Sequence, residues 1–194
     1  MDKISYALGM HLGQQLKRTG VQNLNYQQFT DAIKDTLENH KTAIDSTQMQ
    51  AILNNYFTQL EKTQNEKLKA EGAQFLAENA KREGVVTLPS GLQYQILTPA
   101  IGQKPTKADR VRVHYHGTLI DGTIFDSSVQ RRQPAEFGVT QVIQGWVEAL
   151  QLMPVGAKWR LFIPYNLAYG ERGAGSSIPP YATLIFDVEL LKIL

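Results

Sequence analysis

No arrangement of side chains for nucleophilic or metal chemistry is visible in this sequence. Its 194 residues include no cysteine, which excludes disulfides and thiolate metal sites. No serine–histidine–acid motif is visible either. His114 and His116 lie two residues apart and would share one face of a strand, where they could bind a metal, but there is no third ligand in evidence. Two unrelated surface or hydrogen-bonded histidines are therefore the favoured interpretation, and we expect no metal and no cofactor.

Aromatic and apolar residues are instead concentrated in the second half of the chain, in three ordered motifs. These are VRVHYHGTLIDGTIFDSS from Val111, then VIQGWVEALQLMPVGAKWRLFIP, then LAYGERGAGSSIPPYATLIFDVELLKI. Together they closely resemble the FKBP-type peptidyl-prolyl cis-trans isomerases over essentially all of residues 85–194. The first half resembles the Mip-like bacterial homodimeric branch of that family, through its helical layout and the stretch SYALGMHLGQQL.

The resemblance implies a pocket for a proline ring, with Trp146 at its floor and apolar or aromatic walls. The implied wall residues are Tyr115, Phe125, Val142, Ile143, Tyr169, Ile178 and Phe186. It also implies that Asp126 lies at the pocket edge near the substrate carbonyl, oriented by Tyr115. The backbone N–H of Ile143 and the hydroxyl of Tyr169 are implied to hold the peptide backbone. Taken singly, an apolar residue such as Val142 or Phe186 would be interpreted as ordinary core.

These residue types suit rotation about an X–Pro bond. Amide resonance opposes that rotation with a barrier of roughly 18–20 kcal/mol, and the twisted transition state loses the charge separation of the planar amide. A dry aromatic site removes the water that stabilises the planar form, so it lowers the relative cost of twisting without a nucleophile or a metal. The predicted substrates are proline-containing unfolded or partly folded polypeptides, and the resemblance implies binding of FKBP-class macrolide inhibitors.

Two positions depart from the best-known family pattern. Ala135, in QPAEF, stands where an aromatic residue is frequent, and Ala174, in ERGAGSSIPP, stands where a histidine is common. Both are expected at the pocket rim. They put in question the tightness of macrolide binding and the preference for the residue before proline, rather than the isomerase activity.

The elements that must position these residues form an α+β domain over residues 85–194. Val111, Val113 and Tyr115 alternate with polar residues, which is typical of a strand, and Asp121-Gly122 supplies a hairpin turn. Further strands are predicted at 91–97, 157–163 and 183–191, and one short helix at 145–152. The expected architecture is a curved antiparallel sheet wrapped around that helix.

The first 84 residues contain no proline and are expected to be all helical. Apolar stripes predict one helix from Ile4 to a stop at Gly20 and a second through Phe29, Ile33 and Leu37. A capping box of Asp45 and Gln48 opens a third helix of close to forty residues. Its stripe nearly vanishes after residue 60, which predicts a solvated connecting helix over 61–84.

Three helices with one apolar stripe each make a thin core. We therefore expect residues 1–60 to form a dimerisation domain that buries its apolar surface against a second copy of the chain. The alternative, in which these helices fold back on the second domain, is less favoured because the polar stretch offers nothing to pack against it.

Charge and composition bound the remaining possibilities. Twenty basic and eighteen acidic residues leave a net charge of +2, so neither nucleic acid nor an anionic membrane is indicated as a partner. The sequence as given lacks a signal-peptide pattern, so a cytoplasmic location is the default; a trimmed signal peptide, with a periplasmic or surface location, would leave the same sequence. A second function is kept open: a holdase chaperone or adaptor with weak or vestigial isomerase activity.

Overall fold

The computed structural model describes all 194 residues, which divide into two compact units, residues 1–64 and 65–194. The first unit contains α1 (Lys3–Arg18), α2 (Tyr26–Leu37) and the first part of α3 (Ser46–Asn79). The second unit contains the last turns of α3, a sheet and a short helix. None of the helices combines the length and the hydropathy that a membrane crossing requires.

The helix boundaries of the first unit follow from local chemistry. Gln48 donates its backbone N–H to Asp45 Oδ1 at 2.8 Å, and Asp45 donates its own N–H to Gln48 Oε1 at 3.1 Å. This is the predicted capping box, and it opens α3. Gly20 has a φ of +78° just after α1, which suits a glycine stop. Neither α1 nor α2 buries any residue within the chain, so their apolar stripes remain open.

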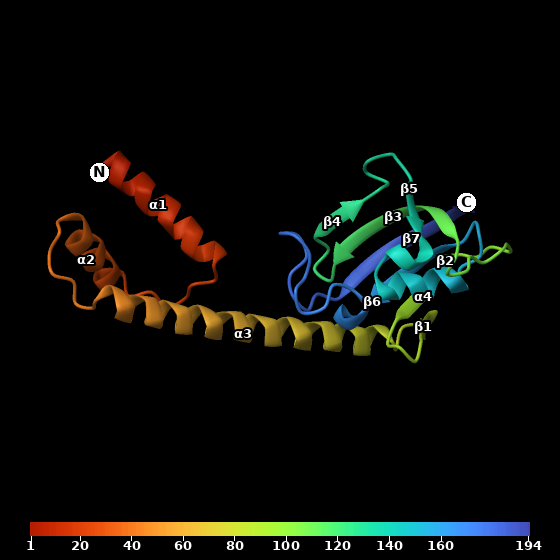
Figure 1. Cartoon of the computed structure of the whole chain (residues 1–194), viewed down its shortest axis with the longest axis horizontal. Helices are drawn as coiled ribbons and strands as arrows, with labels where there is room; N and C mark the ends of the chain where they lie inside the picture. The colour runs from red at the N-terminus through yellow and green to blue at the C-terminus, as the bar shows by residue number, and fades with distance from the viewer. The chain divides into compact units, whose positions relative to one another are not determined.

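The second unit is built on one seven-stranded antiparallel sheet in the order β1-β2-β6-β7-β3-β4, with β5 paired to β3 (Figure 1). The strands are β1 (Val85–Thr87), β2 (Gln93–Thr98), β3 (Arg110–Leu119), β4 (Ile124–Ser127), β5 (Ala135–Gly138), β6 (Lys158–Ile163) and β7 (Leu184–Ile193). Five of these strands, β2, β3, β4, β6 and β7, were predicted from the sequence. Strands β1 and β5 were not predicted, because three or four residues show no clear strand period; β4 is equally short but was predicted from the hairpin turn at Asp121-Gly122.

The curved sheet packs its concave face against α4 (Gln144–Leu152), as the α+β prediction requires (Figure 1). A Cβ on Gly145 would lie 2.6 Å from Ile163 Cγ2, so only glycine lets the helix approach β6 this closely. Strand β3 alternates buried and more exposed residues, which turns Val111, Val113 and Tyr115 toward the helix. The fold class predicted from the sequence is confirmed.

The last turns of α3 are not solvated on all sides, so that expectation is wrong for residues 65–79. One face of these turns is buried or half-buried, and its members recur every three or four residues: Asn65, Leu68, Lys69, Gly72, Phe75, Leu76 and Asn79. More than half of them are polar or glycine. The hydrophobic stripe therefore vanishes in the sequence although the packed face does not. After Asn79 the chain leaves the helix and passes through turns to Gly84.

Candidate active site

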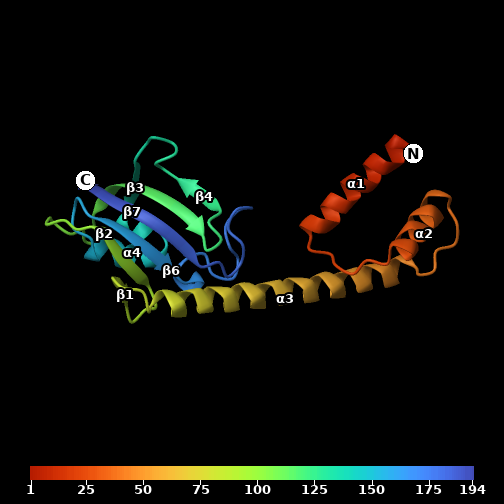
Figure 2. The ribbon, with the colours of Figure 1, turned by 180° about the vertical axis from the view of Figure 1, so that it is seen from behind.

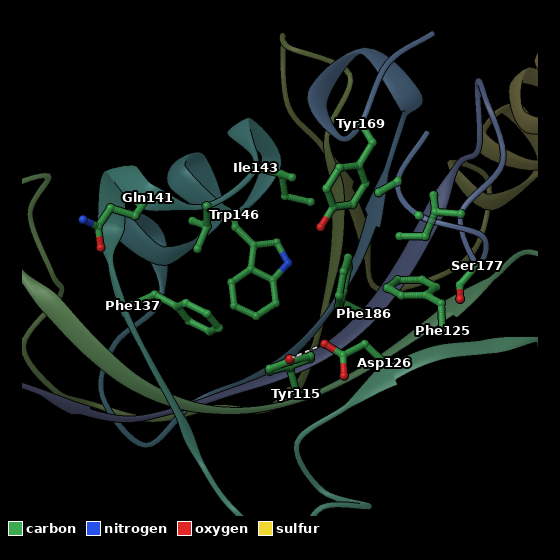
Figure 3. A pocket seen from close by; sticks show the side chains of 14 residues that line it. Tyr115, Phe125, Asp126, Phe137, Gln141, Ile143, Trp146, Tyr169, Ser177 and Phe186 are labelled. Carbon is green, nitrogen blue, oxygen red and sulfur yellow. Dashed lines mark hydrogen bonds between the residues drawn. The ribbon is translucent and has the colours of Figure 1, made fainter. Parts of the chain in front are cut away.

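One cavity of about 640 Å³ opens on the concave side of the sheet beside α4 (Figure 3). All nine residues predicted for the site line it: Tyr115, Phe125, Asp126, Val142, Ile143, Trp146, Tyr169, Ile178 and Phe186. They come from three strands, the start of α4 and the long connection between β6 and β7. Residues separated by up to 71 positions in the sequence thus meet around one hollow. Their roles toward a substrate stay predictions.

Trp146 forms the buried floor of the cavity. It lies in the first turn of α4 and is 4% exposed. Its ring meets those of Tyr115 and Phe186 nearly edge to face, with centroids 5.5 and 5.2 Å apart. Such contacts are favourable for aromatic quadrupoles and fix the orientation of the floor. The indole Nε1 is buried without a hydrogen-bond partner in the protein, so the floor carries one unpaired N–H donor.

A glycine on β3 brings two of the walls together. A Cβ on Gly117 would lie 2.7 Å from the Phe125 ring and 2.8 Å from the Phe186 ring. Those two rings meet edge to face at 5.3 Å between centroids. Only the absence of a side chain at position 117 lets both aromatic rings reach over the strand to the cavity.

Asp126 is the single acid of the cavity, and it is held in place by two donors. The hydroxyl of Tyr115 donates to Asp126 Oδ2, and Arg131 pairs with Oδ1. Burial alone would raise the pKa of Asp126, but the hydrogen bonds from Tyr115 and Arg131 outweigh it and lower that pKa. The carboxylate therefore stays ionised at neutral pH and keeps a fixed orientation at the edge of an apolar hollow. Figure 3 shows it beside the Tyr115 hydroxyl.

Comparisons with known proteins match this architecture. The model of FKBP-type peptidyl-prolyl cis-trans isomerases matches residues 102–191, and that of the domain amino terminal to these isomerases matches residues 1–96. The chain belongs to the FKBP-type peptidyl-prolyl cis-trans isomerase family. Its reaction is accordingly the one predicted from the motifs, cis/trans isomerisation of the peptide bond before proline.

Individual relatives extend the likeness over the whole chain. The FKBP-type 22 kDa peptidyl-prolyl cis-trans isomerase of Escherichia coli is 49% identical over 193 residues, covering 98% of this chain and 94% of the relative. The outer membrane protein MIP of Legionella longbeachae is 42% identical over 199 residues, covering 99% and 85%. The crystal structure of FkpA from Escherichia coli superposes with a TM-score of 0.80 at 33% identity, covering 98% and 95%.

Several residues at the cavity were not singled out from the sequence, among them Phe137, Gln141 and Arg131. Phe137 and Gln141 line the cavity from β5 and the turn after it. Arg131 lies in the turn after β4, and its Nη2 donates to the Tyr115 hydroxyl at 2.8 Å in addition to its ion pair with Asp126. Phe137 belonged to the quoted QPAEF stretch, so an aromatic residue beside the predicted rim was the available signal. For Arg131 the signal was a base five residues after the predicted acid.

The departures from the family pattern occupy two different places. Ala174 lines the cavity, as expected for a rim residue, whereas Ala135 lies on β5 opposite Val113 and packs against the core.

The histidine pair, His114 and His116, lies away from the cavity lining. His114 Nδ1 is 3.0 Å from Ser128 Oγ, and His116 Nδ1 is 2.9 Å from Ser127 Oγ. No cluster of three or more potential metal-binding side chains occurs in the chain.

Proposed function

We propose that the prolyl ring of the substrate binds over Trp146, between the aromatic walls, and that Asp126 faces the carbonyl of the bond that rotates. The gathering of all nine predicted residues around one apolar hollow is the observation that carries this proposal. An X–Pro amide in this hollow loses the water that stabilises its planar, charge-separated form. The twisted amide needs that water less, so the site binds the transition state better than the ground state.

Two further groups orient the peptide in this proposal. The backbone N–H of Ile143 stands at the N-terminal cap of α4, and the Tyr169 side chain also lines the cavity. Both are hydrogen-bonding groups on the wall of an otherwise apolar site. A peptide that pairs with them is held by two hydrogen bonds, which lets its binding energy favour one twisted geometry.

The test is turnover of a short Xaa-Pro peptide by the full chain. Phe125→Ala and Asp126→Ala are each expected to lower kcat/KM at least about tenfold, or about 1.4 kcal/mol of transition-state stabilisation. Ile124→Ala is the matched control, because Ile124 precedes Phe125 on β4 and is 45% exposed. Unchanged turnover in both pocket variants would reject the assigned roles.

The proposed assembly is a homodimer through residues 1–60, with 61–84 as a connecting segment and 85–194 as the isomerase domain. Several large apolar side chains of the first unit are exposed within one chain, including Ile4, Leu8, Ile52 and Leu53. Apolar patches of this kind mark surfaces that another protein covers. A second copy of the chain has the same stripes to bury and is the partner that requires no further molecule.

Light scattering during size-exclusion chromatography tests this assembly. The wild type is expected at twice the 21.8 kDa of one chain. Ile52→Glu should shift it to the single-chain mass, since an ionised carboxylate resists burial in an apolar interface. Gln50→Glu adds the same charge on an exposed position of α3 and should leave the dimer intact. A wild type that elutes as a monomer would contradict the proposal.

The same exposed apolar residues support a second candidate function, a holdase chaperone whose clients bind the first unit. In that case residues 1–84 alone suppress aggregation of a denatured client, and Phe125→Ala in the full chain remains fully protective. Both activities can coexist, because a dimer that holds a client raises the local concentration of its prolines at the pocket. Failure of residues 1–84 in the aggregation assay counts against the chaperone.

The cytoplasmic default is not supported by the relatives, one of which is named an outer membrane protein. A periplasmic or surface location is the proposal that agrees with that name. Fractionation of the source cells, with an antibody against this chain and a cytoplasmic marker enzyme, separates the two locations. Co-fractionation with the cytoplasmic marker alone would refute the proposal.

A further inference from the structure

Within the second unit, the last turns of α3 contact the base of the connection between β6 and β7. Residues 164–183 form this connection, called here the pocket loop, which places Tyr169, Ala174 and Ile178 on the cavity wall. Figure 2 shows the C-terminal turns of α3 running along the edge of this unit. The helix therefore lies behind a segment whose front face lines the proposed substrate site.

Gly72 provides the closest of these contacts. A Cβ at this position would lie 2.5 Å from Thr183 Oγ1 and 3.4 Å from Thr183 Cβ. Thr183 is itself 4% exposed, so it has little room to move away. Glycine in a helix interior is unfavourable relative to alanine, and the close approach to Thr183 gives a reason for it here. Position 72 thus sets how near the helix lies to the end of the pocket loop.

Lys69 provides the second contact, one turn earlier. Its Nζ lies 3.9 Å from the centroid of the Tyr181 ring, within the range of a cation–π interaction. Tyr181 has a φ of +59° and donates its N–H to the carbonyl of Gly170 at 2.9 Å. Its ring also meets that of Tyr165 at 5.2 Å between centroids. Tyr181 therefore ties the two ends of the pocket loop together while Lys69 covers its ring.

The contact is anchored further along the helix by buried groups. Asn79 Nδ2 donates to Gln93 Oε1 at 2.8 Å, and Gln93 Nε2 donates to the Leu76 carbonyl at 2.9 Å. The Phe75 ring packs on the Phe162 ring with centroids 6.0 Å apart. These bonds join α3 to β2 and β6, so the helix is a fixed support rather than a loose neighbour of the loop.

We propose that Lys69 and Gly72 are positioning residues of the isomerase: they fix the pocket loop from behind and thereby place Tyr169 and Ile178 for the substrate. The inference rests on the proposed function, because it assumes that this cavity binds the prolyl peptide. Neither residue lines the cavity, so each acts through the loop. A loop that shifts by a fraction of an ångström weakens the fit to the twisted peptide, to which rates are sensitive.

The first test compares lysine variants of the full chain. Lys69→Ala is expected to lower kcat/KM for an Xaa-Pro peptide about threefold to fivefold, the size of a partly exposed cation–π contact. Lys69→Arg should restore the wild-type value, because a guanidinium also stacks on an aromatic ring. Lys67→Ala is the matched control, since Lys67 lies on the same helix, is 74% exposed and forms an ion pair with Glu71.

The second test is a rescue. Gly72→Ala is expected to displace Thr183 and, with it, the pocket loop. Because rates are sensitive to small misplacements of site residues, kcat/KM should fall about threefold to thirtyfold. Thr183→Ala removes the Oγ1 atom that the new methyl group would meet, so the double variant should recover most of the loss. The wild-type measurement separates the two hypotheses. A folded wild type without turnover rejects the proposed function, whereas an active wild type with Lys69→Ala and Gly72→Ala unchanged rejects the positioning role alone.

Discussion

Removal of the last turns of α3 should destabilise the catalytic unit, although they carry no residue of the cavity. We compare two fragments, residues 65–194 and residues 85–194. The shorter one begins at the domain boundary predicted from the sequence, and it lacks Phe75, Leu76 and Asn79. Removal of these residues exposes two side chains to solvent: Phe162, which is 1% exposed in the full chain, and Gln93, which is 4% exposed.

The magnitude follows from these contacts. Phe75 and Leu76 are each half-buried, and full burial of such side chains contributes about 1.5–3 kcal/mol apiece. The two hydrogen bonds of Gln93 add about 1 kcal/mol each at most, since water replaces the lost partners. A loss of about 2–4 kcal/mol is expected from a total stability of roughly 5–15 kcal/mol. With an m-value of about 2 kcal/mol per molar in urea, the middle of the usual range, the midpoint should fall by about 1–2 M.

Urea unfolding followed by the fluorescence of Trp146 and Trp159 measures this midpoint. Within the longer fragment, Phe75→Ala should reproduce part of the loss, whereas Gln74→Ala should not, because Gln74 is on the exposed side of the helix. Equal midpoints for the two fragments would refute the reasoning. They would mean that the buried face of α3 contributes no net stability and that the isomerase unit begins near residue 85.

Three further outcomes are expected at the site. Hydrogen bonds lower the folded-state pKa of Asp126, so the stability that this carboxylate contributes is complete above the ordinary carboxylate pKa of about 3.9 and is lost as the pH falls through the folded-state value. The value of kcat/KM should therefore be flat above about pH 5. Arg131→Gln should move the acid limb of this pH profile to higher pH. Tyr169→Phe should lower kcat/KM about threefold to tenfold by removing one hydrogen bond to the peptide, without changing the urea midpoint. FKBP-class macrolides should bind competitively with peptide, and Ala174→His should lower the macrolide Kd about threefold to tenfold by adding apolar contact at the cavity wall, which calorimetry measures.

The sequence was sufficient for those parts of the fold that depend on regular periods. The alternation along β3, the capping box of α3 and the turn at Gly122 are local signals, and each predicted an element that the structure contains. The packed face of α3 was invisible for a physical reason. Asn79 is buried through a hydrogen bond, Gly72 through its small size and Lys69 through its aliphatic stem and charge, so none of them adds to a hydrophobic stripe.

Arg131 shows where sequence reasoning about the site ends. Two arginines, Arg131 and Arg132, follow Asp126 at nearly equal distance, and either could supply the charge that its carboxylate needs. Arg132 has a φ of +55° at the end of the turn, whereas the Arg131 side chain reaches both Asp126 and the Tyr115 hydroxyl. The choice depends on turn geometry that no spacing rule encodes. The role of Arg131 can therefore be predicted only from the folded turn. Arg132→Gln is the matched control: this variant should leave the acid limb of the pH profile in place, whereas Arg131→Gln should move it.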